Sequence, residues 1–338
     1  MSWYNASFNK ILVIQTASIG DVILATPVIE KLRAHYPEAR IDMVVKDGIE
    51  QVLKGHPHIH TIMAWDKSEN KYNNLFEILR IIRQNKYDLV VNLQRFFATG
   101  LLTIFSGAKT VGFNKNPLSI FFSRRVTHHI GRKHTSPHEI DRNLALLRFL
   151  NDDKRYLPKL YPGKKAYAKI SQYRTSNYIT ISPASIWFTK QFPVEKWIDF
   201  INQISSDYTI YLLGAESDRA ISQTILQNTR HSQLMDLCGR LNLLESAALI
   251  GGAHMNYVND SAAQHLASAM NAPVTTVYCS TVPAFGFGPL SDDSAVIETD
   301  QQLDCRPCGL HGHQQCPEGH FKCADIDIKK LIKRLEER

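Results

Sequence analysis

The sequence lacks any apolar run near the roughly 20 residues that a membrane-spanning helix needs. The segment Met1–Asn9 has no basic stretch followed by an apolar one, so we expect no secretory signal. With 6 cysteines among 338 residues, a scaffold built from disulfides is excluded. The charged share of 21% and the hydrophobic share of 44% argue against disorder and against a coiled coil. We therefore expect a cytoplasmic globular protein, long enough for two domains.

The two halves of the chain differ in charge. Residues 1–160 hold 23 Lys and Arg against 14 Asp and Glu, whereas residues 161–338 hold 16 against 18. A basic half beside a nearly neutral half predicts a polyanionic partner for the first half only. Nucleic acid, an anionic membrane surface and a phosphorylated glycolipid all fit this charge, and so does a basic face that serves only solubility.

The hydrophobic pattern alternates between strand and helix in both halves. In the first half it predicts strands over 10–15, 40–45, 60–65 and 88–93, and helices over 21–35, 72–83 and 136–150, the last with Ser136 as N-cap. In the second half it predicts strands over 178–181, 208–213, 255–258 and 273–278, and helices over 194–205, 216–228, 243–250, 261–270 and 325–337. This alternation predicts two doubly wound α/β domains, 1–155 and 178–324, with a polar linker over 156–177 and a terminal helix in 325–338.

Loops that follow strands are the candidate site, because ligands of open α/β sheets bind outside the carboxyl ends of the strands. The first such loop, 17–21, has Gly20 and Asp21 but lacks the G-x-G-x-x-G fingerprint of dinucleotide sites. Asp21 fits two roles, a helix N-cap or a catalytic carboxylate. The sequence pattern leaves both open.

Three loops of the second half contain residue types suited to phosphate and ribose. In 182–193, Ser185 supplies a hydroxyl and Lys190 a cation, although a surface lysine beside an aromatic packing patch has the same pattern. In 214–218, Glu216 fits either a carboxylate that binds ribose or a helix cap. In 259–265 a helix opens directly after a strand, so its free backbone N–H groups favour an anion. His265 lies one turn after Ser261, where a packed histidine is the more common finding.

Together these segments resemble the lipopolysaccharide heptosyltransferases of glycosyltransferase family 9, which have a GT-B fold. The resemblance rests on I-G-D-V-I-L-A-T-P at 19–27, T-K-Q-F-P at 189–193, N-D-S at 259–261 with H-L-A at 265–267, F-G-F-G-P-L at 285–290, and a cysteine-rich tail. The motifs run in sequence order from residue 10 to about residue 335. The resemblance implies two Rossmann-like domains that face each other across a cleft, the first binding the acceptor and the second the nucleotide sugar.

The resemblance also implies metal-independent transfer of heptose, with inversion, from ADP-heptose to the inner core on lipid A. By position, Asp21 corresponds to the general base that takes the acceptor proton, and Lys190 to a group that holds the diphosphate. The donor-binding residues implied by these motifs are Ser185, Glu216, Asp260, Ser261, Ala262 and His265. Ala262 departs from the family, where glycine often follows the Asp-Ser pair, and its methyl group narrows the approach of a phosphate.

The basic first half fits an acceptor of this kind, because lipid A phosphates and Kdo carboxylates are anionic. The residues expected to bind the acceptor are Gly20, Arg95, Arg124 and Arg125, with Lys115, Arg132 and Lys133 as further contacts. The loop 114–135, with Phe121 and Phe122 beside basic residues, is expected to touch lipid at the inner face of the inner membrane. No RNA-binding signature such as RNP1 is present, so nucleic acid is not an expected partner.

The cysteine-rich tail has the spacing C-x₂-C-x₇-C-x₆-C, formed by Cys305, Cys308, Cys316 and Cys323. The first pair suits zinc, but the second pair is wider than the usual knuckle. Structural zinc is therefore the less favoured interpretation, and cysteines that are reduced or that staple a loop by disulfides are preferred. We expect no cofactor and no catalytic metal. A GT-B transferase with another nucleotide sugar, or a non-catalytic protein that binds nucleotides or polyanions, stays as an alternative.

Overall fold

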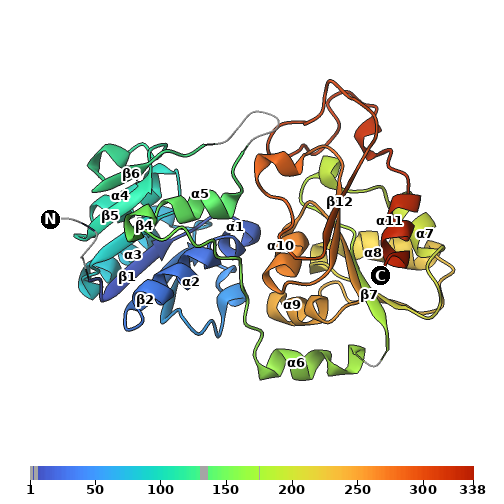
Figure 1. The fold of residues 1–338 in the computed structure, drawn as a ribbon, viewed down its shortest axis with the longest axis horizontal. Helices are drawn as coiled ribbons and strands as arrows, with labels where there is room; N and C mark the ends of the chain where they lie inside the picture. Colours follow the sequence, from blue (N-terminus) through green and yellow to red (C-terminus); the bar gives the residue numbers. More distant parts are fainter. Residues whose placement is uncertain (1–2, 4–6, 130–135, 175) are drawn as a thin grey trace. The chain divides into compact units, whose positions relative to one another are not determined.

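The computed structural model describes residues 3, 7–129, 136–174 and 176–338. The chain forms two compact units, and the chain passes from the first to the second between Tyr161 and Pro162. Each unit contains a six-stranded sheet in which all neighbouring strands are parallel (Figure 1). No helix within the described residues is long and apolar enough to cross a membrane.

Unit 1 has the strand order β3-β2-β1-β4-β5-β6. Its strands are β1 (Lys10–Ile14), β2 (Arg40–Lys46), β3 (Thr61–Trp65), β4 (Leu89–Asn92), β5 (Lys109–Phe113) and β6 (Arg124–Val126). Its helices are α1 (Ile19–Ile23), α2 (Thr26–His35), α3 (Lys71–Asn85), α4 (Phe97–Ile104) and α5 (Glu139–Ala145), with short 3₁₀ segments η2 (Glu50–Leu53), η3 (Ser119–Phe121) and η4 (Arg148–Leu150). Because the chain moves outward in both directions from the β1–β4 pair, the switch point of the sheet lies between these strands.

Unit 2 has the strand order β12-β11-β10-β7-β8-β9, which is the same winding as in unit 1. Its strands are β7 (Tyr178–Ser182), β8 (Thr209–Leu212), β9 (Leu234–Asp236), β10 (Met255–Asn259), β11 (Val274–Tyr278) and β12 (Ser294–Glu298). Its helices are α6 (Lys164–Ile170), α7 (Val194–Ile201), α8 (Arg219–Asn228), α9 (Leu243–Gly251), α10 (Ala262–Ala269) and α11 (Lys329–Glu336). The 3₁₀ segments are η5 (Ser171–Tyr173), η6 (Phe188–Lys190), η7 (Glu216–Asp218), η8 (Pro283–Phe285) and η9 (Lys322–Ala324).

The helix predicted over 21–35 is wrong, because two helices occupy this segment. Ser18 is the N-cap of α1, and α1 ends at Ile23. Pro27 lies in the first turn of α2, where its missing N–H and its ring prevent a continuous helix from residue 21. The hydroxyl of Thr26 donates to the Ile23 carbonyl (2.7 Å), which satisfies an acceptor that the break leaves free.

The helix predicted over 136–150 is wrong at both ends. His138, not Ser136, is the N-cap of α5, and its ring nitrogen accepts from the Ile140 N–H (3.3 Å). The helix ends at Ala145 and η4 follows it. Strands β5, β6, β9 and β12 and helices α4 and α6 were not predicted; β6 and β9 have only three residues each, too few to show a period.

The segment 156–177, predicted as a polar linker, contains helix α6. Ala166 and Ile170 form a buried face of this helix, which packs against α9 of unit 2. The terminal helix α11 also belongs to this unit, because Leu331 and Leu335 lie in the same core cluster as Trp197. Both segments therefore belong to the packed structure of unit 2.

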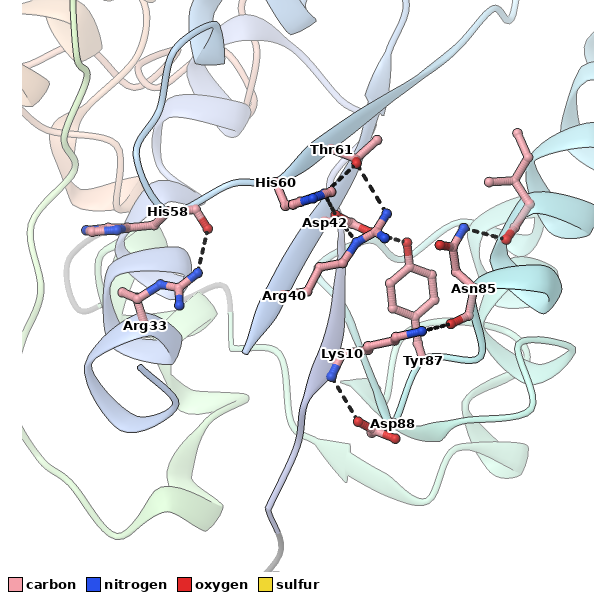
Figure 2. Close-up of polar contacts among 11 residues, drawn as sticks. Lys10, Arg33, Arg40, Asp42, His58, His60, Thr61, Asn85, Tyr87 and Asp88 are labelled. Carbon is pink, nitrogen blue, oxygen red and sulfur yellow. Dashed lines mark hydrogen bonds and ion pairs between the residues drawn. The ribbon is translucent and has the colours of Figure 1, made fainter. Parts of the chain in front are cut away.

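Polar groups anchor the amino ends of the strands in unit 1 (Figure 2). The carboxylate of Asp42 on β2 is fully buried and accepts from Arg40 Nε (2.9 Å) and from the Tyr87 hydroxyl (2.6 Å). Burial raises the pKa of Tyr87, and the hydrogen bond to Asp42 adds to the increase. Asp88 accepts from the backbone N–H of Lys10 (2.8 Å) at the start of β1. Because these partners satisfy a buried charge, the network holds the sheet together at the edge opposite the candidate site.

Candidate active site

The candidate site of unit 2 lies at the carboxyl ends of β7 and β10, which are neighbours at the switch point of the sheet. Lys190 Nζ lies 2.7 Å from Asp260 Oδ2, and the two side chains are 15% and 9% exposed. The hydroxyl of Thr281, which follows β11, donates to the same carboxylate oxygen (2.6 Å). The structure thus brings two of the predicted residues together and adds Thr281, which sequence reasoning missed.

The buried side chain of Asn259 holds the loop that carries Lys190. Its carbonyl oxygen accepts from the Phe192 N–H (3.0 Å), and its amide donates to the Pro183 carbonyl (2.8 Å). Within the loop, the Gln191 amide donates to the Ser185 carbonyl (2.6 Å). Asn259 therefore fixes both ends of the loop, and its place in the N-D-S motif was the available signal.

The tail between β12 and α11 supports Lys190 from outside the sheet. The backbone of Thr189 donates to the His313 carbonyl (3.0 Å), and the His313 N–H donates to the Thr189 hydroxyl (2.8 Å). Gly312 has a φ of +77°, and a Cβ there would lie 3.1 Å from Lys190 Cγ. Only glycine combines this backbone conformation with so close an approach.

Arg306, also in the tail, holds the segment after β11. Its guanidinium donates to the carbonyls of Cys279 (2.6 Å) and Thr281 (2.8 Å) and pairs with Glu298. Because Thr281 in turn bonds to Asp260, Arg306 positions one of the two donors that hold that carboxylate. Sequence reasoning missed Arg306 because it lies among the cysteines, far from the motif it supports.

All four cysteines of the tail are thiols without a disulfide partner. Among the residues that the structure describes, no three His, Cys, Asp or Glu side chains are arranged to hold a metal ion. Burial raises the pKa of Cys323 to about 11, and neighbouring thiols add to the increase. The expectation that these cysteines hold no structural zinc stays a prediction.

The start of α10 lies directly after Asp260. Ser261 is the N-cap residue and its side chain makes no capping hydrogen bond to the helix. Ser261 and Ala262 are half-buried, whereas His265 is buried on the body of the helix. Uncapped backbone N–H groups and the positive end of the helix dipole therefore lie beside the Lys190–Asp260 pair.

Ser185 and Glu216 lie at the same sheet edge, away from this pair. Ser185 is half-buried in the loop after β7. Glu216 follows β8, is largely exposed, and pairs with Arg219 (3.0 Å). Asp218, not Glu216, accepts from the Ala215 N–H (2.8 Å), so Glu216 does not make this cap. In the described part of the chain, neither Ser185 nor Glu216 bonds to Lys190 or Asp260.

In unit 1, Asp21 lies at the third position of α1. Its Oδ2 accepts from the Ser18 N–H (3.1 Å) and from the Ser18 hydroxyl (2.6 Å), which forms a capping box. The N-cap interpretation of Asp21 is wrong, because Ser18 takes that position. Both bonds end on Oδ2, so among the described residues Oδ1 has no hydrogen-bond partner.

A second carboxyl group lies near Asp21. Glu139 at the start of α5 is buried and forms an ion pair with Arg142 (2.6 Å). Burial raises the pKa of Glu139, the Arg142 guanidinium opposes the increase, and the Asp21 carboxylate adds to it. Arg95 contributes positive charge at the same place. Sequence reasoning missed Glu139 because the segment was interpreted only as a structural helix.

Two of the predicted acceptor residues, Arg124 and Arg125, line a cavity of about 600 Å³ in unit 1. The cavity lies between β6 and α5, and its basic lining includes Arg124, Arg125 and Arg148. The Arg124 guanidinium lies over the ring of Trp3, 4.8 Å from its centroid. Gly20 and Arg95 do not line this cavity. Arg132 and Lys133 lie outside the described residues.

His128, near the same cavity, is expected to make unit 1 sensitive to acid. Burial lowers the pKa of His128 to about 3, and the cations of Arg95 and Arg142 add to the effect. Since the folded pKa lies below the ordinary value near 6.5, protons favour the unfolded state, and stability falls as the pH drops below that value. We expect a loss of about 2 kcal/mol between pH 6.5 and pH 5 from this group.

The measurement is the amide hydrogen exchange of peptides from β5 as a function of pH. His128→Leu should reduce the acid slope, whereas His129→Leu, at an exposed neighbouring position, should leave it unchanged. Equal slopes in the wild type and His128→Leu would contradict the assignment. The buried His56, whose pKa burial also lowers to about 3, accounts for a remaining slope.

The sequence of residues 75–320 matches the profile of glycosyltransferase family 9 (heptosyltransferase). The chain belongs to glycosyltransferase family 9. This family 9 chain is 26% identical over 281 residues to lipopolysaccharide heptosyltransferase 3 of Escherichia coli, covering 78% of this chain and 81% of that protein. It is 23% identical over 312 residues to lipopolysaccharide heptosyltransferase 1 of Salmonella typhimurium, covering 87% of this chain and 96% of that protein.

Solved structures of family 9 share the fold of this chain. The E. coli ADP-heptose LPS heptosyltransferase II superposes with a TM-score of 0.79 at 22% identity, covering 97% of this chain and 98% of that one. A family 9 glycosyl transferase of Veillonella parvula superposes with a TM-score of 0.83 at 22% identity, covering 100% and 99%. The predicted family and the predicted GT-B fold, with two doubly wound domains, are confirmed.

Proposed function

We propose that this family 9 glycosyltransferase transfers heptose from ADP-heptose to the inner core of lipopolysaccharide, with inversion and without a metal. The observation that carries the proposal is the Lys190–Asp260–Thr281 cluster beside the start of α10. It provides a cation and free backbone N–H groups at one sheet edge, as a departing diphosphate requires. The relatives named above, all of them heptosyltransferases where a substrate is named, support heptose as the sugar.

On the donor side, the diphosphate gains negative charge as its bond to the anomeric carbon breaks. The Lys190 ammonium and the first turn of α10 stabilise this charge. In the free protein Asp260 neutralises Lys190, so the diphosphate competes with a carboxylate for the cation. Ser185 and Ser261 supply hydroxyls to the phosphates, His265 lies on the helix behind them, and Glu216 accepts from ribose hydroxyls.

On the acceptor side, one base is needed. The acceptor hydroxyl attacks the anomeric carbon from the face opposite the leaving ADP, which inverts the configuration, and Asp21 Oδ1 takes the hydroxyl proton. Arg95 near Asp21 and Arg124 and Arg125 in the basic cavity bind anionic groups of the acceptor. Gly20, buried in α1, leaves room beside Asp21.

The alternative donor is another nucleotide sugar, and Ala262 is the observation that favours it. Its methyl group stands half-buried at the first position of α10, where many family members have glycine. A phosphate approaching these N–H groups meets this methyl group. A comparison of ADP-heptose with other nucleotide sugars as donors separates the two cases.

The test is incubation of the full chain with ADP-heptose and Kdo-lipid A. We expect release of ADP and a lipid product heavier by one heptose, with the same rate in EDTA. Release of UDP or GDP from other sugars, with none of ADP, would establish a different donor. No release from any donor would leave a binding protein and overturn the proposal.

A further inference from the structure

Unit 1 carries exposed aromatic and apolar side chains on three elements. They are Tyr72 and Phe76 of α3, Phe96 and Phe97 at the start of α4, and Ile120 and Phe121 of η3, each between 55% and 71% exposed. We call this set the aromatic surface. Single exposed apolar residues are normal in soluble proteins, but a cluster of large ones marks an interaction site.

Helices α3 and α4 pack against each other. Arg83 near the end of α3 donates to the Phe105 carbonyl at the end of α4 (3.2 Å), and Leu75 and Ala98, near the starts of the two helices, belong to one core cluster. The segment before η3 joins the start of α4, because the Asn116 amide donates to the Phe96 carbonyl (2.9 Å). A Cβ at Gly100 of α4 would lie 3.1 Å from the Leu118 side chain. The aromatic surface is therefore continuous.

The stretch of sequence that contains the aromatic surface is strongly basic. Residues 67–125 contain 10 Lys and Arg against 3 Asp and Glu, an excess of +7 that equals the net charge of the whole chain. The exposed cations nearest in sequence to the aromatic residues are Lys71, Arg95, Lys115 and Arg125. Glu77, an acidic residue of α3, is paired with Arg80 (2.9 Å). Burial lowers the pKa of Lys67 to about 8, and Lys46 and Lys71 add to the decrease, as expected in a positive field.

We propose that the aromatic surface docks this protein onto an anionic lipid bilayer. Aromatic rings favour the headgroup level of a membrane, where one side is apolar and the other wet. Lysine and arginine next to them pair with anionic lipids, whereas lysine is depleted from protein–protein interfaces. The combination of exposed rings with exposed cations therefore fits a membrane better than a protein partner.

The structure changes which residues make this contact. The prediction that Phe122 touches lipid is wrong, because Phe122 is buried. Its ring packs so close to Gly112 of β5 that a Cβ there would overlap it. Phe121 and Ile120 point outward instead. The residues of α3 and α4 join them only in the folded unit, so the loop 114–135 alone gave an incomplete surface.

The test uses the full chain and vesicles without any sugar acceptor or donor. We expect co-sedimentation with phosphatidylglycerol–phosphatidylcholine vesicles, weak binding to pure phosphatidylcholine, and release by salt. The double variant Phe97→Ser/Phe121→Ser should bind about tenfold more weakly at unchanged melting temperature, since it removes two rings from the contact. Tyr167→Ser, which removes an exposed ring of α6 in unit 2, should bind like the wild type.

Three outcomes would overturn the docking proposal. They are equal binding to neutral and anionic vesicles, unchanged binding of the double variant, and a wild-type dimer that the double variant converts to a monomer. The last would make the surface an interface between two copies of the chain. Because these vesicles contain no substrate, failure of the proposed transfer reaction would leave the docking result unaffected, and the reverse also holds.

Discussion

Asp21→Asn is expected to lower kcat for heptose transfer by about 10²–10⁴-fold, the range for loss of a general base. Asparagine keeps an oxygen that accepts from the Ser18 N–H, so α1 should retain its capping interaction. The KM for ADP-heptose should change little, because Asp21 acts on the acceptor. Steady-state ADP release, measured with Kdo-lipid A as acceptor, gives both constants.

Ser18→Ala is the matched control for this prediction. It removes the N-cap hydroxyl, which costs about 1 kcal/mol of stability, but leaves the Asp21 carboxylate in place. Its kcat should stay within about tenfold of the wild type. If Asp21→Asn turned over at the wild-type rate, the base would lie elsewhere, and Glu139→Gln would be the next variant to measure.

Lys190→Met is expected to lower kcat by about 10²–10³-fold, the range for loss of one group that stabilises developing negative charge. Methionine keeps much of the side-chain volume but removes the cation that faces the diphosphate. Lys190→Arg should restore only part of the rate, because its larger planar group does not fit the same contacts. The readouts are kcat and the affinity for ADP measured by calorimetry.

The loss of Lys190 also leaves Asp260 without its cation, so folding must be controlled. Lys190→Met/Asp260→Asn removes both charges and should restore stability without restoring activity. Lys196→Met, which breaks an ion pair with Asp325 on the same unit (3.0 Å), should leave kcat unchanged. Full activity in the double variant would show that the Lys190–Asp260 pair is only structural.

The architecture was predictable because parallel sheets bury both faces of their central strands. β1 is a nearly continuous apolar run and β7 is rich in β-branched and aromatic residues, so both stood out from the polar loops around them. The missed strand β6 is a three-residue edge strand with two arginines, a composition no strand pattern covers. The break before α2 was overlooked although Pro27 was visible, because the apolar spacing continues across it.

The chemistry of the candidate site was predictable only in part. Lys190 and Asp260 follow neighbouring strands, so loop position alone brought them to one sheet edge. Thr281, Arg306 and Glu139 depend on tertiary contacts between distant segments, which no local spacing encodes. The orientation of Phe121 and Phe122 was likewise set by packing against β5.

The C-terminal stretch has a practical consequence for labelling. Leu331 and Leu335 fill the interior of unit 2, and Gly312 lies beneath the Lys190 side chain. A variant shortened to remove the cysteines of the tail would therefore lose both these core leucines and the glycine beneath Lys190. Replacing the half-exposed Cys305, Cys308 and Cys316 with serine removes the accessible thiols and keeps the tail. A single cysteine for dye attachment can then be introduced at another surface position.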